Sequence, residues 1–470
     1  MKLSALPIPE FNDGPRAERR VTLPRTHRLA LSTIGTAIFR PSGLLLPIRQ
    51  VFSTSILVYV LSIGTGVITA RLLGPTGRGE LAAMLLWPAL AAGLFTLGIR
   101  PALTYSLAAQ RGEPPCLILM GLLLTFCAGL VAAGCGAVIV PIWLQGYSPD
   151  VITFAQWAML IAPVTLLLRS AKGILQARGQ YGFYNRNHYV PPLISLGALG
   201  ALAFFGVLNP FTAAMAILSP PLPLLIANLV WIVRTERPRF CEPAHSLREL
   251  LSYGLRSWGK DVVGTLATEV DRAVLIGLVS PAALGLYVVA KHLARPTQAL
   301  SNAVVTVLFP EASRVENKNA VRLVARAARI STAVSCALVL PLALAAPPLL
   351  ELLYGQEFGA AAGPFRILLI DAVLLGFSSI LMQAFMSLGR PGVVTALLVL
   401  GLVVNVIGML LLVPAFGLPG AAFAVLISTI VRLAFLLLCF PLVLQVSPPS
   451  PLPRAKDVEW LWRGRQATGR

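Results

Sequence analysis

Long apolar stretches alternate along this chain with short breaks that are rich in Gly, Pro or charged residues. A helix that crosses a bilayer needs roughly 20 apolar residues, and about 12 stretches of the chain approach that length. Their pattern differs from the alternation over about ten residues that is typical of outer-membrane barrels, so it predicts transmembrane helices. The predicted spans are 50–70, 80–98, 117–144, 151–170, 190–208, 211–233, 256–279, 283–308, 330–353, 363–388, 392–414 and 419–444.

The composition also indicates a membrane protein. Of the 470 residues, 56% are hydrophobic and only 12% are charged, and the mean hydropathy is +0.79. A soluble domain carries about 25% charged residues, so this chain could not cover a surface that faces water. We therefore expect an all-α polytopic membrane protein.

The basic residues are distributed unequally between the two sides of the membrane. They gather in the N-terminal segment, in every second connection and in the C-terminal tail, whereas the opposite connections contain only Arg71 and Arg78. Because cytoplasmic loops carry the excess of Lys and Arg, both termini are predicted to face the cytoplasm. These loops account for much of the formal net charge of +19, and we expect no nucleic acid partner.

Residues suited to metal, redox or nucleotide chemistry are scattered. The six cysteines form no CxxC pair and most lie in apolar runs, so we expect small buried hydrophobic residues rather than disulfides. The four histidines do not cluster, which predicts no metal site. The stretch GPTGRGE at 74–80 resembles a phosphate loop only superficially. The short opposite connections leave little room for a catalytic domain, and we expect neither an enzyme nor a cofactor.

Two turns at equivalent places in the topology share their Pro and Gly positions. Pro75 and Gly79 correspond to Pro281 and Gly285, each pair 206 positions apart. An offset of six spans indicates a parallel repeat, which predicts two six-helix bundles around a central cavity and transport by rocking of one against the other. The predicted division is a cytoplasmic basic extension 1–47, a first bundle 48–233, a cytoplasmic linker 234–247, a second bundle 248–445 and a cytoplasmic tail 446–470.

Four blocks of sequence resemble a known family. They are ITARLLGPTGRGELAA at 68–83, RGQYGFYNRNHYVPPL at 178–193, GLYVVAKHLARPTQALSNAVVTVLFPEASR at 285–314 and LLYGQEFGAAAGPFRILL at 352–369. In this order they are similar to bacterial polysaccharide-biosynthesis flippases of the multidrug/oligosaccharidyl-lipid/polysaccharide exporter superfamily. The resemblance implies a flippase in the bacterial cytoplasmic membrane that moves a polyprenyl-diphosphate-linked oligosaccharide to the outer leaflet.

The seventh predicted span carries an unusual number of charges. Asp261, Thr265, Thr268 and Arg272 recur at helical spacing and form one polar stripe. Lys260 and Asp271 lie on an adjacent line, and Glu269 can pair with Arg272 within the helix. A charge at the centre of a bilayer costs roughly 2.5–3.5 kcal/mol on insertion scales, so such residues normally face a cavity or each other.

The eighth span adds Lys291, His292 and Arg295, for which the acids of span 7 are candidate partners, and Asp371 stands alone in span 10. Cations that face a lumen could pair with phosphates. Structural roles remain open: ion pairs that fix the bundle, an interhelix hydrogen bond for His292, and Arg366 or Arg432 as the partner of Asp371. The candidate cavity residues are Lys260, Asp261, Glu269, Asp271, Arg272, Lys291, His292, Arg295 and Asp371.

At the repeat offset, three charged positions of span 7 correspond to uncharged positions of span 1, namely Thr54, Thr65 and Gly66. We therefore expect the charged lining to belong to the second bundle alone. Two other functions remain open, a cation-coupled multidrug exporter of the same superfamily and a membrane-embedded polysaccharide polymerase. Membrane lipids are expected partners, and polysaccharide assembly proteins are further candidates.

Overall fold

In the computed structural model, residues 45–108, 114–241, 243–312 and 317–449 are described. The predicted extension 1–47 and tail 446–470 lie almost entirely outside these ranges. The first half of the described chain contains α1 (Leu45–Leu94), α2 (Ile99–Ala108), α3 (Pro114–Trp143), α4 (Pro149–Ala158), α5 (Ile161–Ala177), α6 (Tyr181–Phe204), α7 (Pro210–Leu218) and α8 (Pro221–Glu236). The second half contains α9 (Pro243–Leu278), α10 (Pro281–Ala294), α11 (Gln298–Ala312), α12 (Asn317–Leu344), α13 (Ala346–Tyr354), α14 (Ala362–Ser387) and α15 (Pro391–Cys439).

The prediction of an all-α polytopic membrane protein is confirmed. Seven helical segments of the described residues are long and apolar enough to cross a membrane. Two of them, Ile56–Leu94 and Pro391–Leu444, each contain two predicted spans, which are divided at Gly74 and Gly417. Both glycines have a positive φ, of 66° and 63°, a conformation that glycine adopts at no steric cost. The remaining predicted spans correspond to α6, α9 and α10 with α11, which carry more polar residues.

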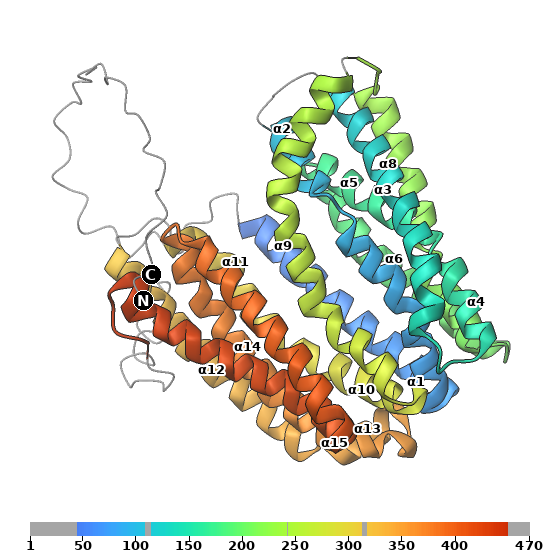
Figure 1. Cartoon of the computed structure of the whole chain (residues 1–470), viewed down its shortest axis with the longest axis vertical. Helices are drawn as coiled ribbons and strands as arrows, with labels where there is room; N and C mark the ends of the chain where they lie inside the picture. The colour runs from blue at the N-terminus through green and yellow to red at the C-terminus, as the bar shows by residue number, and fades with distance from the viewer. Residues whose placement is uncertain (1–44, 109–113, 242, 313–316, 450–470) are drawn as a thin grey trace, which may run out of the picture.

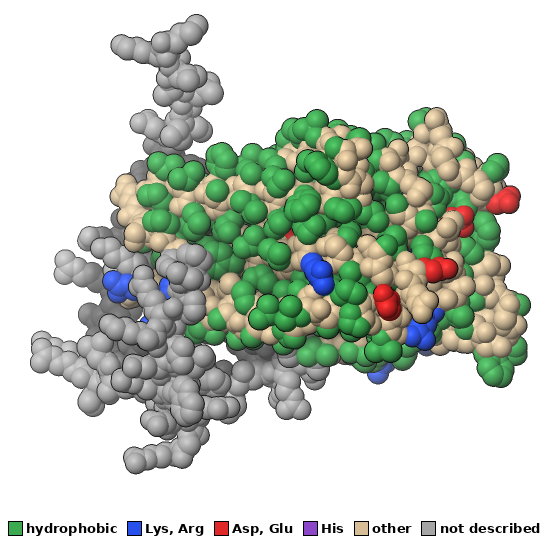
Figure 2. Space-filling model, turned by 90° about the horizontal axis from the view of Figure 1, so that it is seen from below, with side chains coloured by type: hydrophobic (Ala, Val, Ile, Leu, Met, Phe, Trp, Pro, Cys, Tyr) green, Lys and Arg blue, Asp and Glu red, His purple; other side chains and the backbone are tan. Residues whose placement is uncertain are grey.

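The exterior of the helices is largely apolar. Large side chains such as Phe204, Leu344 and Leu411 are exposed. The face shown in Figure 2 is mainly hydrophobic, with a few isolated charges. A surface of this kind suits contact with lipid tails, since a soluble protein rarely exposes large continuous apolar patches.

The two ends of the helices differ in their charge. We call the end that carries Arg178, Arg237, Arg239 and Arg390 at its connections the basic end, and the opposite end the distal end. Figure 1 shows α4, α10 and α13 together toward the lower right, at the distal end, with α2 and the end of α8 at the top.

At the distal end the two halves meet through the repeated Pro and Gly positions. A methyl group placed on Gly79 would lie 1.7 Å from the carbonyl oxygen of Pro281. In the reciprocal contact, a methyl group on Gly285 would lie 2.0 Å from the carbonyl oxygen of Pro75. Only glycine allows α1 and α10 to approach this closely, so the sequence repeat has a direct counterpart in the contact between the halves.

Two further contacts close the distal end. Arg71 donates hydrogen bonds to the carbonyl oxygens of Leu352 and Leu353 at the end of α13, the latter at 2.8 Å. The indole of Trp143, on α3, donates to the carbonyl oxygen of Ala273 on α9 at 2.7 Å. Each contact joins the first half to the second. We call these contacts, together with the two Gly–Pro contacts, the distal seal.

Toward the basic end, α9 lies against the turn between α1 and α2. A methyl group on Gly98 would lie 2.1 Å from the carbonyl oxygen of Gly254, and Trp258 donates to the carbonyl oxygen of Leu94 at 2.7 Å. Helix α9 begins at Pro243, within the stretch predicted as a linker. The first helix of the second half therefore packs along the first half, with its polar stripe facing that side at Thr265, where Gly93 approaches.

The prediction for the cysteines is wrong at two points. Cys116 and Cys241 form a disulfide, with their Cα atoms 5.5 Å apart. The chain after α8 returns across the start of α3, where the amide of Arg239 donates to the carbonyl oxygen of Pro115 at 3.2 Å. This return path pairs cysteines that are 125 positions apart, a distance over which sequence spacing gives no guidance. Cys127, Cys135 and Cys336 are exposed rather than buried.

We expect Gly79→Ala to destabilise the closed distal end. The added methyl group would overlap the carbonyl group of Pro281, and overpacking of this kind costs about 1–3 kcal/mol or more. Thermal unfolding of the purified protein in detergent should show a midpoint several degrees lower. Gly277→Ala is the matched control, because its new methyl group would have no neighbour within 4 Å beyond the adjoining residues and backbone of its own helix. Equal midpoints for the two variants would contradict a close contact at Gly79.

Candidate functional site

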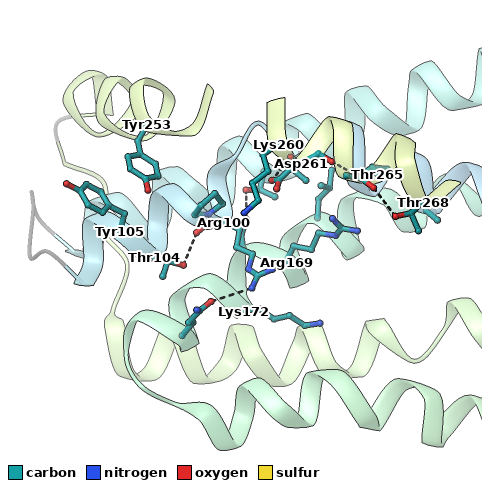
Figure 3. Close-up of a pocket in the computed structure, with 18 of the residues that line it drawn as sticks. Arg100, Thr104, Tyr105, Arg169, Lys172, Tyr253, Lys260, Asp261, Thr265 and Thr268 are labelled. Atoms are coloured by element: carbon teal, nitrogen blue, oxygen red, sulfur yellow. Dashed lines mark hydrogen bonds between the residues drawn. The ribbon is translucent and has the colours of Figure 1, made fainter. Parts of the chain in front are cut away.

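A pocket of about 1050 Å³ lies between α9 and helices α1, α2, α3, α5 and α6 of the first half. It extends along α2 and α5 toward the basic end, where Ala108 and Gln176 line it. Figure 3 shows its labelled side chains converging from α2, α5 and α9. We call this space the cationic pocket, after the residues described next.

Four basic side chains line the pocket: Arg100 on α2, Arg169 and Lys172 on α5, and Lys260 on α9. Gly173 brings the first three together, because a methyl group at this position would lie 2.8 Å from the carbonyl oxygen of Arg100. The hydroxyl of Thr104 adds a hydrogen bond of 3.1 Å to the carbonyl oxygen of Gly173. Close packing of α2 on α5 therefore concentrates positive charge on one wall.

None of these four cations has an acidic partner within 4 Å among the described residues. Arg100 donates instead to neutral groups, the amide oxygen of Gln176 at 3.4 Å and the hydroxyl of Tyr184 at 3.2 Å. Two acids also line the pocket, Asp261 and Glu269. Four formal positive and two formal negative charges leave the lining with a net charge of +2.

The two acids are already engaged. Asp261 accepts a hydrogen bond of 3.3 Å from the hydroxyl of Thr96, and Glu269 forms an ion pair with Arg272, as the sequence predicted. The first interaction ties Asp261 to the turn between α1 and α2, and the second keeps Glu269 on α9. The uncompensated positive charge therefore lies mainly on the wall formed by α2 and α5.

The character of the pocket changes along its length. Tyr105 and Tyr253 lie at one end with their rings stacked at 4.6 Å between centroids, whereas Thr265 and Thr268 lie toward the other end (Figure 3). The cations occupy the middle. Aromatic faces and hydroxyl groups are suited to a polar organic ligand, and unpaired cations are suited to an anion.

The structure separates the sequence candidates into groups. Three of them line the pocket: Lys260, Asp261 and Glu269. Asp271 and Lys291 form a buried ion pair outside it, and the hydroxyl of Tyr287 donates to the same carboxylate at 2.7 Å. Lys291 also donates to the carbonyl oxygen of Thr268 at 3.1 Å. Two of the three span 7 acids are thus partners of basic residues, Glu269 within the helix and Asp271 across the hairpin.

The remaining candidates lie toward the distal end or in the second half. His292 lies within electrostatic range of Arg78, Arg272 and Arg295. Asp371 is buried on α14 and faces α15, where Thr429 hydrogen-bonds it and Arg432 is the nearby cation. The other proposed partner, Arg366, donates to the carbonyl oxygen of Ala343 instead.

The expectation that the charged lining belongs to the second half alone is wrong. Arg100, Arg169 and Lys172 come from the first half. From the sequence alone, these three residues are expected to be basic residues near helix ends that determine the orientation of the protein in the membrane. The spacing of Arg169 and Lys172, three positions apart near the end of an apolar run, was the one signal that they share a face. That this face meets Arg100 depends on tertiary packing.

The sequence profile of the polysaccharide biosynthesis protein family matches residues 68–363, which is more than half of the chain. The chain belongs to this family. This finding agrees with the resemblance carried by the four sequence blocks. A probable low-salt glycan biosynthesis flippase, Agl15, of Haloferax volcanii is 24% identical over 209 residues. That alignment covers 43% of this chain and 44% of the relative, so the chain matches less than half of the relative's length.

Two solved structures share the fold over most of the chain. The lipid II flippase MurJ in an inward closed conformation has a TM-score of 0.71 at 13% identity, covering 89% of this chain and 90% of that one. An inward-facing multidrug resistance MATE transporter of the MOP superfamily has a TM-score of 0.68 at 16% identity, covering 88% and 96%. At these identities the likeness concerns the fold alone.

The pair of Asp271 and Lys291 should behave as a coupled unit. Lys291→Met alone leaves a buried carboxylate without its cation, and breaking a buried pair in this way costs about 3–5 kcal/mol. The double variant Lys291→Met with Asp271→Asn removes both charges and should recover much of that loss. A double-mutant cycle of thermal midpoints measures the coupling. Additive effects of the two substitutions would contradict the pair.

Proposed function

We propose that this protein is a flippase that moves a polyprenyl-diphosphate-linked oligosaccharide across the cytoplasmic membrane of a bacterium, for cell-surface polysaccharide. The single observation that carries the proposal is the cationic pocket, with its four unpaired basic residues and a net charge of +2. Family membership and the MOP transporter fold support it.

The charge of the pocket fits the cargo. A diphosphate diester carries two negative charges, which the net charge of the lining would neutralise. Arg100 and Arg169 can each bind phosphate oxygens in a bidentate manner, and Lys172 and Lys260 act as point charges. The hydroxyl groups of Thr104, Thr265 and Thr268, which also line the pocket, can bind sugar hydroxyls. The aromatic and threonine-lined ends extend the space beyond the phosphates.

The orientation follows from the positive-inside rule. The basic end would face the cytoplasm, with both termini on that side. The pocket reaches toward this end, and the distal seal closes the other. Cargo would enter from the cytoplasmic leaflet while its lipid tail remains among the membrane lipids, and it would leave after the seal opens. Enzymes that assemble the glycan are the partners expected on the two sides of the membrane.

A cation-coupled multidrug exporter is the second candidate, because the MATE structure has almost the same fold similarity. Export of cationic drugs would require a binding space dominated by acids. The excess of bases in the pocket favours an anionic cargo instead. Asp371 and His292 remain candidates for coupling to an ion gradient in either function.

We expect Arg169→Gln and Lys172→Gln each to weaken the binding of farnesyl diphosphate, a short prenyl diphosphate, by about tenfold or more. A hydrogen bond to a charged group contributes about 1.5–3 kcal/mol, and 1.4 kcal/mol corresponds to about tenfold. Binding is measured with purified protein in nanodiscs. In cells, the same variants should reduce surface polysaccharide and accumulate the lipid-linked precursor.

Arg178→Gln is the matched control. Arg178 follows the same helix, α5, but pairs with Glu236 at 2.8 and 2.5 Å outside the pocket. It should therefore retain binding and export. Normal polysaccharide in the Arg169 and Lys172 variants, combined with altered drug sensitivity, would replace the flippase proposal with the multidrug exporter.

A further inference from the structure

Arg78 occupies an unusual place in the distal seal. It belongs to the GPTGRGE stretch and lies directly before Gly79, whose contact with Pro281 joins the two halves. The residue is only 6% exposed. It lies within electrostatic range of Arg272 and His292 on α9 and α10, and of Tyr354 on α13. A basic residue of the first half is thus buried within electrostatic range of three helices of the second.

The guanidinium of Arg78 has no acidic partner among the residues that the structure describes, and its Nε has no hydrogen-bond partner there. The Nε of Arg272 is likewise buried and without a partner. An uncompensated charge in a protein interior is costly, and arginine cannot lose its proton to reduce that cost. The closed seal therefore retains a buried positive charge that contributes nothing visible to its stability.

The neighbouring acids do not balance this charge. Glu269 pairs with Arg272, and Asp271 pairs with Lys291. Arg78 and Arg295 remain without an ion pair within the described part of the chain. We call the four bases Arg78, Arg272, Lys291 and Arg295, with the two acids Glu269 and Asp271, the distal cluster.

The distal cluster continues the polar path of the pocket. Glu269 lines the pocket and pairs with Arg272, which lies within electrostatic range of Arg78. At a rise of 1.5 Å per residue, Arg272 lies about 18 Å further along α9 than Lys260, toward the distal end. One helix therefore connects a set of cations in the middle of the first half with a second set beside the seal.

We propose that Arg78 and Arg272 form a second anion-binding site, which receives the diphosphate of the cargo from the cationic pocket when the distal seal opens. The proposal rests on the proposed function and extends it to two successive sites. One guanidinium comes from each half, and the free Nε groups supply donors for phosphate oxygens. When the halves separate at Gly79 and Pro281, water and the anion gain access to both.

The first test uses the stability of the closed protein without ligand. If Arg78 is reserved for an anion, Arg78→Met removes an unpaired buried charge and should raise the thermal midpoint by several degrees. Arg366→Gln is the control, because Arg366 is an exposed arginine near the same end that donates to the carbonyl oxygen of Ala343 at 2.9 Å. The control should not raise the midpoint. A lower midpoint for Arg78→Met would assign Arg78 a structural role and overturn the proposal.

The second test measures binding of farnesyl diphosphate in nanodiscs in two backgrounds. Gly285→Ala disrupts the seal from the second half, because its methyl group would lie 2.0 Å from the carbonyl oxygen of Pro75. In this background, with Arg169→Gln present to weaken the cationic pocket, Arg78→Met should weaken the remaining binding at least about tenfold. With Gly285 intact, Arg78→Met should change binding less than about twofold, whereas Arg169→Gln weakens it.

The outcomes separate this proposal from the proposed function. Failure of farnesyl diphosphate to bind the protein with Gly285 intact contradicts the proposed function. Binding that depends on Arg169 but not on Arg78 in either background overturns the second site alone. A further outcome is that replacing gluconate by chloride raises the thermal midpoint only when Arg78 is present, while farnesyl diphosphate binding does not depend on Arg78. The site would then bind a simple halide, and the proposed transfer of the diphosphate to it would be wrong. If Gly285→Ala does not fold, the stability test decides.

Discussion

A charged side chain inside a membrane needs either a partner or a hydrated space, and this constraint organises the protein. The charges of α9 and α10 satisfy it in two ways. Asp271 and Lys291 neutralise each other in the interior, with Tyr287 as a further donor to the carboxylate. Lys260 meets the constraint differently, because it lines a pocket into which bases of the first half also project. The first arrangement fixes the bundle, and the second leaves charge available to a ligand.

Glycine sets how closely the helices around these charges approach. Gly79 and Gly285 bring the backbones of the two halves together at the distal end, and Gly173 brings α2 against α5 so that their cations share a wall. Small residues allow such contacts between membrane helices, where hydrophobic burial alone provides little driving force. The seal and the concentration of positive charge therefore have the same physical origin, which is backbone contact at positions without a side chain.

The two cation sets give a simple physical picture of transport. Under the proposed function, the cationic pocket would bind a diphosphate while the seal is closed, and Arg78 lies buried in the seal without an ion-pair partner among the described residues. An anion that reaches Arg78 only after the seal opens would pair with its charge and so stabilise the open form relative to the closed form. Binding of the anion would therefore favour opening. On this proposal, electrostatic attraction would link cargo binding to the conformational change.

The sequence by itself determined the all-α membrane class, the order of the spans, the Pro–Gly equivalence and the pairing of Glu269 with Arg272, because periodicity and i,i+3 spacing are local properties of a helix. Its blocks also indicated the family. The membership of Arg100, Arg169 and Lys172 in the pocket, the pairing of Cys116 with Cys241 and the burial of Arg78 were decided only by tertiary structure. Each of these features depends on which face of one helix packs against a second helix that is distant in the sequence. A hydrophobic run can face either lipid or protein, so its local sequence does not specify which face makes that contact.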